Sequence, residues 1–212
     1  MLHNNAIYVL VIDTTEMINL DKLKQIYKFS KELSIEDASV LIKSAKNISF
    51  KKKEILIDEG SLKTTVFFIK KGIVRCYCIN EKGEEITFGL VTENQIIANI
   101  DTILYDRPSN FYFESLEETK TFSIDYSIVE NIIESNPKLQ KNRKFFAQKM
   151  MKLQHERVKS FVLLNPEERY LDFIKKNPTL VNRVPGKYIA NVLGITPVSL
   201  SRIRARVVNQ KK

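Results

Sequence analysis

The residues best suited to specific chemistry lie near the end of the chain, where arginines and hydroxyl side chains alternate with apolar ones. Guanidinium groups donate paired hydrogen bonds to guanine edges or to phosphates, and hydroxyls can bond to either group. The chemistry that this combination favours is the recognition of DNA. The candidate contacts are Lys187, Thr196, Val198, Ser199, Ser201, Arg202, Arg204 and Arg206.

A helix-turn-helix is the element that would position these side chains. The sequence GKYIANVLGITPVSLSRIRA at 186–205 places the small Ala190 where two helices cross, and Gly194 where the turn needs a positive φ. Thr196 is suited to cap the second helix, and Pro197 suits its first position. A helical hairpin without any role in DNA binding is the alternative. The apolar residues expected in the shared core are Ile189, Leu193, Ile195, Leu200, Ile203 and Val207.

Three side chains of the second helix are expected to approach the bases. A recognition helix enters the major groove with its first turns at the base edges. We expect Arg202 to make a bidentate bond to guanine, Val198 to touch a thymine methyl group, and Ser199 to reach a base edge or a phosphate. Phosphate contacts position a protein on DNA without reading the sequence. The residues expected to make them are Lys187, Arg204 and Arg206.

The charge of the chain is divided unevenly along its length. The formal net charge is +9, but residues 137–212 hold 18 basic and four acidic residues, a net charge of +14. Residues 1–136 hold 16 basic and 21 acidic residues, a net charge of −5. This asymmetry indicates that only the C-terminal part meets a polyanion. A lysine-rich surface with no nucleic-acid partner is the alternative explanation.

Residues suited to catalysis or to holding metals are few. The chain has two histidines, His3 and His155, and two cysteines, Cys76 and Cys78. It shows no Ser-His-Asp set, no glycine-rich phosphate loop and too few cysteines for an iron–sulfur cluster. We therefore expect no enzyme activity, no cofactor and no metal site. Haem ligation by His155 and a redox role for the two cysteines are the alternatives.

The beginning of the sequence bears on where the protein acts. The apolar run at 6–12 lacks a basic flank and is too short to span a bilayer. We therefore expect a cytoplasmic protein without a membrane partner, whose cysteines are thiols because that compartment is reducing. Residues 1–19 resemble an extension, and either Met1 or Met17 could be the start.

Short strands fill the middle of the sequence. From 48 to 124, apolar and β-branched runs alternate with turn signals such as Lys82-Gly83 and Arg107-Pro108. Spacing of this kind is typical of a sandwich, jelly roll or barrel. The segment 80–83 is expected to close a hairpin. Strands are predicted at 48–50, 55–58, 66–70, 73–79, 85–91, 95–98, 111–115 and 119–124.

Helices are predicted on both sides of this strand-rich segment. One covers 20–44, and a long one covers 137–164, where Phe146, Met150 and Leu153 have the spacing of a coiled-coil seam. Such a seam would pair with a second copy of the chain, while a helix buried within one monomer is the alternative. Shorter helices are predicted at 125–134, 167–176, 186–193 and 197–208.

Several motifs resemble those of the cAMP receptor protein/FNR (Crp/Fnr) superfamily of transcription regulators. They are Asp58-Glu59-Gly60, KGIVR at 71–75, GEEI at 83–86, the long helix and the ending YIANVLGITPVSLSRIRARV, which is similar to a subgroup common in Bacteroidetes. The resemblance implies an α+β protein with four parts. These are an N-terminal extension at 1–19, a cyclic-nucleotide-binding-type β-roll (jelly roll) at 20–136, a dimerisation helix at 137–164 and a winged helix-turn-helix domain at 165–212.

The resemblance also implies a function. A regulator of this kind acts as a homodimer on a near-palindromic operator in double-stranded DNA, because the two-fold symmetry of the protein is mirrored in its site. RNA polymerase is a further candidate partner. The alternatives are a cyclic-nucleotide-responsive regulator of the same architecture and a β-roll ligand-binding protein that does not bind DNA.

The sequence departs from the family at the nucleotide-binding cassette. Nucleotide-binding members carry a Gly-Glu pair, which holds the ribose, and an Arg-Ser or Arg-Thr pair, which holds the cyclic phosphate. Here the corresponding positions are Ala98-Asn99 and Ser109-Asn110, without the carboxylate or the guanidinium. Because bidentate Arg–phosphate pairs are strong, we expect no response to cAMP. Arg107 is an alternative phosphate ligand, and the effector is another small molecule or none.

Overall fold

The structure, a computed structural model, describes residues 35–209. Within them the chain divides into two compact units. The first comprises 35–74 and 91–148, and the second comprises 75–90 and 149–209. The boundaries predicted at 136/137 and 164/165 mark where the sequence pattern changes at the two ends of the long helix. The compact units divide at 74/75, 90/91 and 148/149 instead. The reason is that the segment Arg75–Leu90 packs with the C-terminal helices.

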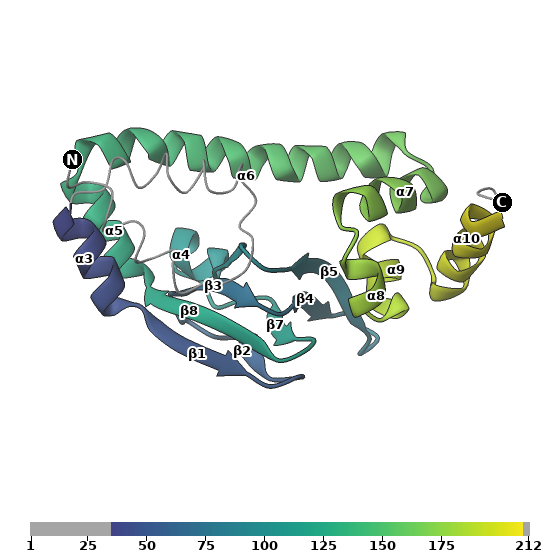
Figure 1. Ribbon diagram of the computed structural model, residues 1–212, viewed down its shortest axis with the longest axis horizontal. Helices are drawn as coiled ribbons and strands as arrows, with labels where there is room; N and C mark the ends of the chain where they lie inside the picture. Colours follow the sequence, from purple (N-terminus) through teal and green to yellow (C-terminus); the bar gives the residue numbers. More distant parts are fainter. Residues whose placement is uncertain (1–34, 210–212) are drawn as a thin grey trace. The chain divides into compact units, whose positions relative to one another are not determined.

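Eight strands form two four-stranded sheets, in the orders β1–β8–β3–β6 and β2–β7–β4–β5. This architecture confirms the predicted β-roll, and every predicted strand is present (Figure 1). The strands are β1 (Lys46–Phe50), β2 (Ile55–Ile57), β3 (Thr65–Lys71), β4 (Val74–Ile79), β5 (Glu85–Val91), β6 (Ile96–Ile97), β7 (Tyr112–Ser115) and β8 (Thr119–Asp125).

The core of the first unit lies between strands whose side chains alternate between buried and exposed positions. On β8, Thr119, Thr121 and Ser123 are buried while the residues between them are more exposed. In the antiparallel register, Phe67 of β3 lies opposite Ser123 and Ile69 lies opposite Thr121. The period of two places small hydroxyl side chains beside large apolar ones on the inner face. The cluster at the centre contains Leu56, Ile57, Phe67, Ile69, Val74 and Ile97.

Three of the described helices lie entirely within the first unit, and one of them is absent from the sequence-based prediction. The segment α3 (Ile35–Ser44) is the described part of the helix predicted at 20–44, and α5 (Tyr126–Ser135) confirms the helix predicted after Asp125. The additional helix is α4 (Ile100–Tyr105), which Asn99 caps. A helix of six residues is too short for an amphipathic period to show in the sequence.

The long helix α6 (Pro137–Leu163) agrees with its predicted bounds. The side chains of Phe146, Met150 and Leu153, which define the predicted seam, lie outside the described residues. The remaining helices are α7 (Pro166–Lys176), α8 (Leu180–Arg183), α9 (Gly186–Leu193) and α10 (Pro197–Asn209), of which only the single-turn α8 was not predicted.

The C-terminal part of the described chain is helical throughout. Residues 126–209 contain helices and connecting segments, so the wing strands expected beside the helix-turn-helix are not among the residues that the structure describes. Asn165 begins α7 with a capping box. The Asn165 side chain accepts from the backbone N–H of Glu168, and the Glu168 carboxylate accepts from the backbone N–H of Asn165. None of the described helices is long and apolar enough to cross a membrane.

Candidate nucleic-acid interface

The helices α9 and α10 form the predicted helix-turn-helix within the second unit. Gly194 ends α9 in the left-handed region, with φ 66° and ψ 37°, and its N–H bonds back to the carbonyls of Ala190 and Asn191. The N–H of Ile195 also donates to the Ala190 carbonyl, at 3.0 Å. Ile189 and Ala190 are completely buried, so the small side chain allows the two helices to approach closely.

The first turn of α10 is fixed by Thr196. Its Oγ1 accepts from the backbone N–H of Ser199 at 3.1 Å, which is the cap that the sequence predicts. The two hydroxyl oxygens of Thr196 and Ser199 also lie 3.0 Å apart, so both are already engaged with one another. Leu200, Ile203 and Val207 are buried against α9, which anchors the inner face of the helix.

The outer face of α10 presents a small exposed surface that we name the reading face: Val198, Ser201, Arg202 and Ala205. These positions follow the spacing of one helical stripe, and all four are exposed. Val198 is 61% exposed although it is apolar. Ser199 lies beside this stripe and is half-buried. An exposed arginine, a hydroxyl and an unburied β-branched side chain are the groups that contact base edges in a major groove.

Arg206 lies one turn beyond Arg202 and has an ion-pair partner. Its Nε is 2.9 Å from Oε2 of Glu167, a residue of α7. The Arg206 side chain is 59% exposed, so its other guanidinium nitrogens remain accessible. Lys187, at the start of α9, is exposed as well. Both cations can reach phosphates, although Arg206 is already partly neutralised.

Arg204 is placed differently from the other arginines of α10. Its guanidinium lies 6.0 Å from the ring centroid of Tyr170 in α7, and the residue is half-buried. Its Nε and Nη2 atoms are buried and have no hydrogen-bond partner among the described residues. The reason lies in the helical period, because Arg204 follows Leu200 by four residues and so lies next to the inward row. Arg204 therefore points away from the reading face.

Arg169 of α7 is a residue that sequence reasoning missed. It donates from Nε to the Leu193 carbonyl at 3.1 Å and from Nη1 to the Leu164 carbonyl at 2.6 Å. Its guanidinium also lies 5.1 Å from the ring centroid of Phe161. The end of α9 is thereby held by α7 and α6. A lone arginine in an amphipathic helix carries no sequence signal for such a role.

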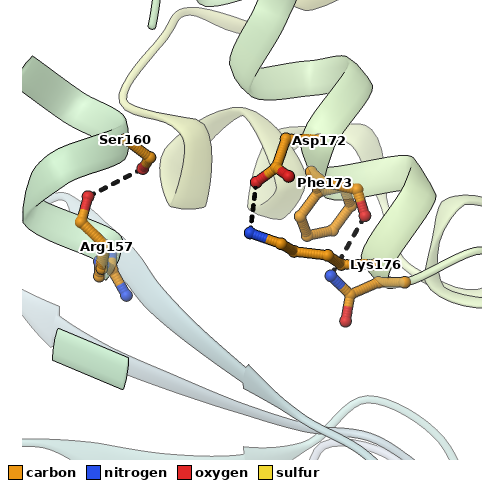
Figure 2. A network of polar contacts seen from close by, with 6 residues as sticks. Arg157, Ser160, Asp172, Phe173 and Lys176 are labelled. Atoms are coloured by element: carbon orange, nitrogen blue, oxygen red, sulfur yellow. Dashed lines mark hydrogen bonds and ion pairs between the residues drawn. The ribbon is translucent and has the colours of Figure 1, made fainter. Parts of the chain in front are cut away.

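Figure 2 shows three polar contacts that lie within α6 or α7. Ser160 Oγ donates to the Arg157 carbonyl at 2.8 Å, and Asn177 Nδ2 donates to the Phe173 carbonyl at 3.2 Å. Lys176 lies 2.7 Å from Asp172, so its charge is locally neutralised. The exposed cations Lys187, Arg202 and Arg206 belong to α9 and α10 and take no part in these contacts.

The cassette positions in the first unit are bonded internally. Asn99 is 2% exposed, and its Nδ2 donates to the Ser61 carbonyl at 3.0 Å while its Oδ1 accepts from Thr102 N–H at 3.4 Å. Ser109 is also buried, and its Oγ donates to the Phe111 carbonyl at 2.8 Å. These side chains support α4 and the following loop, with their polar atoms turned toward the protein.

An acidic side chain contacts one of the predicted cassette positions. The carboxylate of Asp101 accepts from both the backbone N–H and the Nδ2 of Asn110, at 3.3 Å each. Arg107 is exposed and Ala98 is half-buried.

The described residues contain no group of three or more potential metal ligands. Cys76 and Cys78 are free thiols, the first buried and the second half-buried. His155 is exposed on α6. The candidate DNA contacts that the sequence indicates all lie on α9, on α10 or in the turn between them.

Comparisons with known proteins agree with the fold of the β-roll. Residues 47–136 match the family model described as cyclic nucleotide-binding domain. The global nitrogen regulator of Nostoc sp. is 26% identical over 92 residues, which cover 43% of this chain and 41% of that relative. The likeness between these two sequences thus extends over less than half of either protein.

Solved structures extend the likeness to most of the chain. FixK2 from Bradyrhizobium japonicum is 18% identical, with a TM-score of 0.65 and coverage of 79% of this chain and 86% of that one. A protein from Eubacterium rectale, described as a transcriptional regulator of the crp/fnr family, is 16% identical, with a TM-score of 0.66 and coverage of 84% and 86%. Residues 47–136 thus form a cyclic-nucleotide-binding-type β-roll, and the described chain has the fold of Crp/Fnr regulators.

Proposed function

We propose that this protein is a sequence-specific DNA-binding transcription regulator that acts as a homodimer, not an enzyme. The observation that carries the proposal is the reading face of α10, which is exposed on a helix whose other side is buried. It lies in a segment, 137–212, with a net charge of +14. The relatives support the same conclusion, because those compared are described as regulators of nitrogen or of transcription.

The residues of the interface take distinct roles in this proposal. Arg202 makes the bidentate bond to guanine, and Val198 contacts a thymine methyl group. Ser201 reaches a base edge or phosphate from the same face. Lys187 and Arg206 bind phosphates, and Arg206 does so in competition with Glu167. Thr196 and Ser199 contribute by fixing the first turn of α10, and Arg204 lies outside the interface.

The homodimer forms, in this proposal, along the C-terminal half of α6. Met151, Val158 and Val162 are large apolar side chains at a spacing of seven and four residues, and each is more than 60% exposed. A row of this kind on one helix matches the spacing of a coiled-coil seam. A second copy of the chain is the occupant that covers the row, because the same row on its mate is complementary to it.

The β-roll does not respond to cAMP in this proposal. Asn99 and Ser109 bond internally, and the Asp101 carboxylate stands beside the loop. A cyclic-nucleotide-responsive regulator is the second candidate, because residues 47–136 match the nucleotide-binding family model. Arg107 is the exposed cation that would serve it. Calorimetry with cAMP and cGMP distinguishes the two.

A selection of bound sequences from a random pool of double-stranded DNA tests the proposal. The wild-type protein is expected to enrich a near-palindrome whose half-sites lie about 34 Å apart, one helical turn. Arg202→Ala serves as the matched variant, and enrichment should be lost at one base pair of each half-site. If the wild type enriches no sequence, the proposal fails. If a site is enriched, transcription from a template that carries it tests RNA polymerase as a further partner.

A further inference from the structure

The hairpin of β4 and β5 contacts the first helix of the helix-turn-helix. Arg75 of β4 is 2% exposed, and its guanidinium lies between two aromatic rings. The distance from its Cζ to the ring centroid is 3.8 Å for Tyr77 of β4 and 4.5 Å for Tyr188 of α9. Both belong to the second unit, although 113 positions separate Arg75 from Tyr188. A cation held between two rings thus joins the hairpin to α9.

An ion pair fixes the guanidinium between the rings. Arg75 Nη2 lies 2.7 Å from Oε2 of Glu85, on the neighbouring strand β5. Glu85 is 40% exposed, so the carboxylate keeps water while the arginine is withdrawn from it. The planar guanidinium can bond to a carboxylate at its edge and stack on rings at both faces. The guanidinium of Arg75 is thus close to Glu85, Tyr77 and Tyr188 at the same time.

Two further contacts hold the hairpin within the same unit. The backbone N–H of Thr87 in β5 donates to Oδ1 of Asn191 in α9 at 3.3 Å. Arg157 of α6 donates from Nη1 to the Phe88 carbonyl. Burial lowers the pKa of the Arg157 guanidinium, and the neighbouring Cys76 opposes this shift. The hairpin is therefore bonded to two helices of the unit, at α9 and at the C-terminal half of α6.

We propose that Arg75 is a positioning residue for DNA recognition, acting on α10 through Tyr188 and α9. This inference rests on the proposed function. Ile189 and Ala190 of α9 pack completely buried against α10, so a shift of α9 moves the reading face. Recognition of base edges tolerates little displacement, and sites held by rigid elements lose less affinity to disorder. The hairpin, part of the β-roll sequence, thus sets the geometry of the DNA-binding helices.

A double-mutant cycle between Arg75 and Tyr188 tests this inference. Arg75→Leu removes the cation, Tyr188→Leu removes the ring, and Tyr188→Phe keeps the ring and serves as the matched control. Leucine is suited to position 75 because a buried charge can be replaced by an apolar side chain without loss of folding, and the exposed Glu85 keeps its hydration. The two measurements are the affinity for the selected operator and amide hydrogen exchange in 186–193.

Each leucine variant is expected to weaken operator binding about three- to tenfold, which converts to about 0.7–1.4 kcal/mol and lies within the range of cation–π energies. The double variant should be no weaker than the more affected single variant, because both remove one contact. Exchange in 186–193 should accelerate in the leucine variants and stay at the wild-type rate in Tyr188→Phe. If Arg75→Leu fails to fold, the operator affinity of Tyr188→Leu and its amide exchange in 186–193 decide whether the inference holds.

Unchanged affinity and unchanged exchange in the folded variants would overturn the inference, as would additive losses in the double variant. Failure of the proposed function is a separate result, because the wild type would then bind no operator. In that case exchange in 186–193 still decides whether Arg75 holds α9, since it is measured without DNA.

Discussion

The ring of Phe161 occupies the space that any side chain at position 194 would need. A Cβ on Gly194 would lie 2.7 Å from Cε1 of Phe161, and the glycine already has a φ of 66°. Two independent constraints therefore require glycine at this turn. One is the left-handed backbone conformation, and the other is the close approach of a ring from α6 to the helix-turn-helix.

Gly194→Ala is expected to destabilise the protein by more than the backbone conformation alone explains. The conformation costs about 1–3 kcal/mol for a residue other than glycine, and displacement of the Phe161 ring adds to it. Gly83→Ala is the matched control, because Gly83 has a φ of 77° and open space around it. Chemical denaturation measures both. A combined Gly194→Ala/Phe161→Ala variant should recover the part of the stability loss that is steric. Equal losses of stability in Gly194→Ala and Gly83→Ala would contradict the role of Phe161.

Arg202 and Arg206 are expected to differ in the type of DNA contact. Arg202→Ala should cost about 1–3 kcal/mol and relax the preference at one base pair in each half-site. Arg206→Ala should weaken binding to all sequences alike and flatten the salt dependence by about one unit per site. Titrations on operator and on random DNA at several salt concentrations separate these effects. Equal losses on both DNAs for Arg202→Ala would assign it to a phosphate.

Glu167 provides a control for the role of Arg206. Its Oε2 lies 2.9 Å from Arg206 Nε, so Glu167→Gln releases the guanidinium from a negative partner. We expect stronger binding to random DNA in this variant, by at most about 1 kcal/mol, because exposed ion pairs contribute little. The same titration measures it, and weaker binding would indicate that the pair orients Arg206 for its phosphate.

Lysine at two positions of α6 should separate the dimer. Met151 and Val158 are exposed in the single chain, and the proposed seam would bury both. Met151→Lys/Val158→Lys places charges in that apolar contact, where they cannot be hydrated. Sedimentation should show a dimer for the wild type and a monomer for the variant. Lys152→Ala, which removes one partner of a surface ion pair with Glu156, should remain dimeric.

The interpretation of α6 is contradicted by a wild-type protein that sediments as a monomer at micromolar concentration. It is also contradicted if the lysine variant remains dimeric. In that second case Met150→Lys/Leu153→Lys tests the seam that the sequence pattern predicts.

Cyclic nucleotides are expected to bind weakly or not at all. Asp101 places a negative charge beside Asn110, and the side-chain amide of Asn99 is bonded to the protein itself. Calorimetry with millimolar cAMP and cGMP should therefore show no saturable heat. A micromolar dissociation constant, about −8 kcal/mol, would contradict this prediction. Arg107→Ala would then show whether that exposed arginine supplies the phosphate contact.

The stability of the first unit should depend on pH through Asp125. Its carboxylate accepts from the N–H and the hydroxyl of Ser127, at 2.9 and 2.6 Å, and these bonds lower its pKa below 3.8. A lowered pKa in the folded state gives stabilisation that is present above the unfolded value and lost as pH falls through the folded one. Asp125→Ala should cost about 1 kcal/mol at pH 7.

Denaturation of the wild type and of Asp125→Ala at pH 7 and near pH 3 measures this difference. The difference in the free energy of unfolding between the two proteins should be smaller at the lower pH, because the wild-type carboxyl becomes protonated. Asp125→Asn keeps a neutral cap and should show a smaller loss with little pH dependence. An equal difference in the free energy of unfolding at both pH values would contradict the stabilising role of the ionised Asp125 carboxylate.

Local patterns in the sequence predict most of this fold. Each strand and each helix longer than one or two turns has a period, a cap or a turn signal within its own residues. Gly194 and Thr196 illustrate this well, because both act on their immediate neighbours in the chain. The α4 helix shows the opposite case, since its cap Asn99 was interpreted as a ligand position and its length hides any period.

The position of Arg204 could have been inferred from the helical period, which places it next to the inward row of Leu200 and Val207. The contact of Arg75 with Tyr188 could not be inferred in this way. It joins residues that no local pattern relates, and the same holds for Arg169 with the Leu193 carbonyl. Such pairs depend on the tertiary arrangement, and no local period, cap or turn signal corresponds to them.

The hairpin Arg75–Leu90 has a consequence for the order in which the protein can be made. During synthesis from the N-terminus it leaves the ribosome long before α9, since the bond between Thr87 and Asn191 spans 104 positions. Until then Arg75 and Tyr77 lack the helix that contacts them, so the second unit can close only after α9 has been made. A nascent chain stalled before residue 186 would therefore display this hairpin uncovered. A fragment that begins at residue 149 would likewise lack a strand pair on which α9 packs.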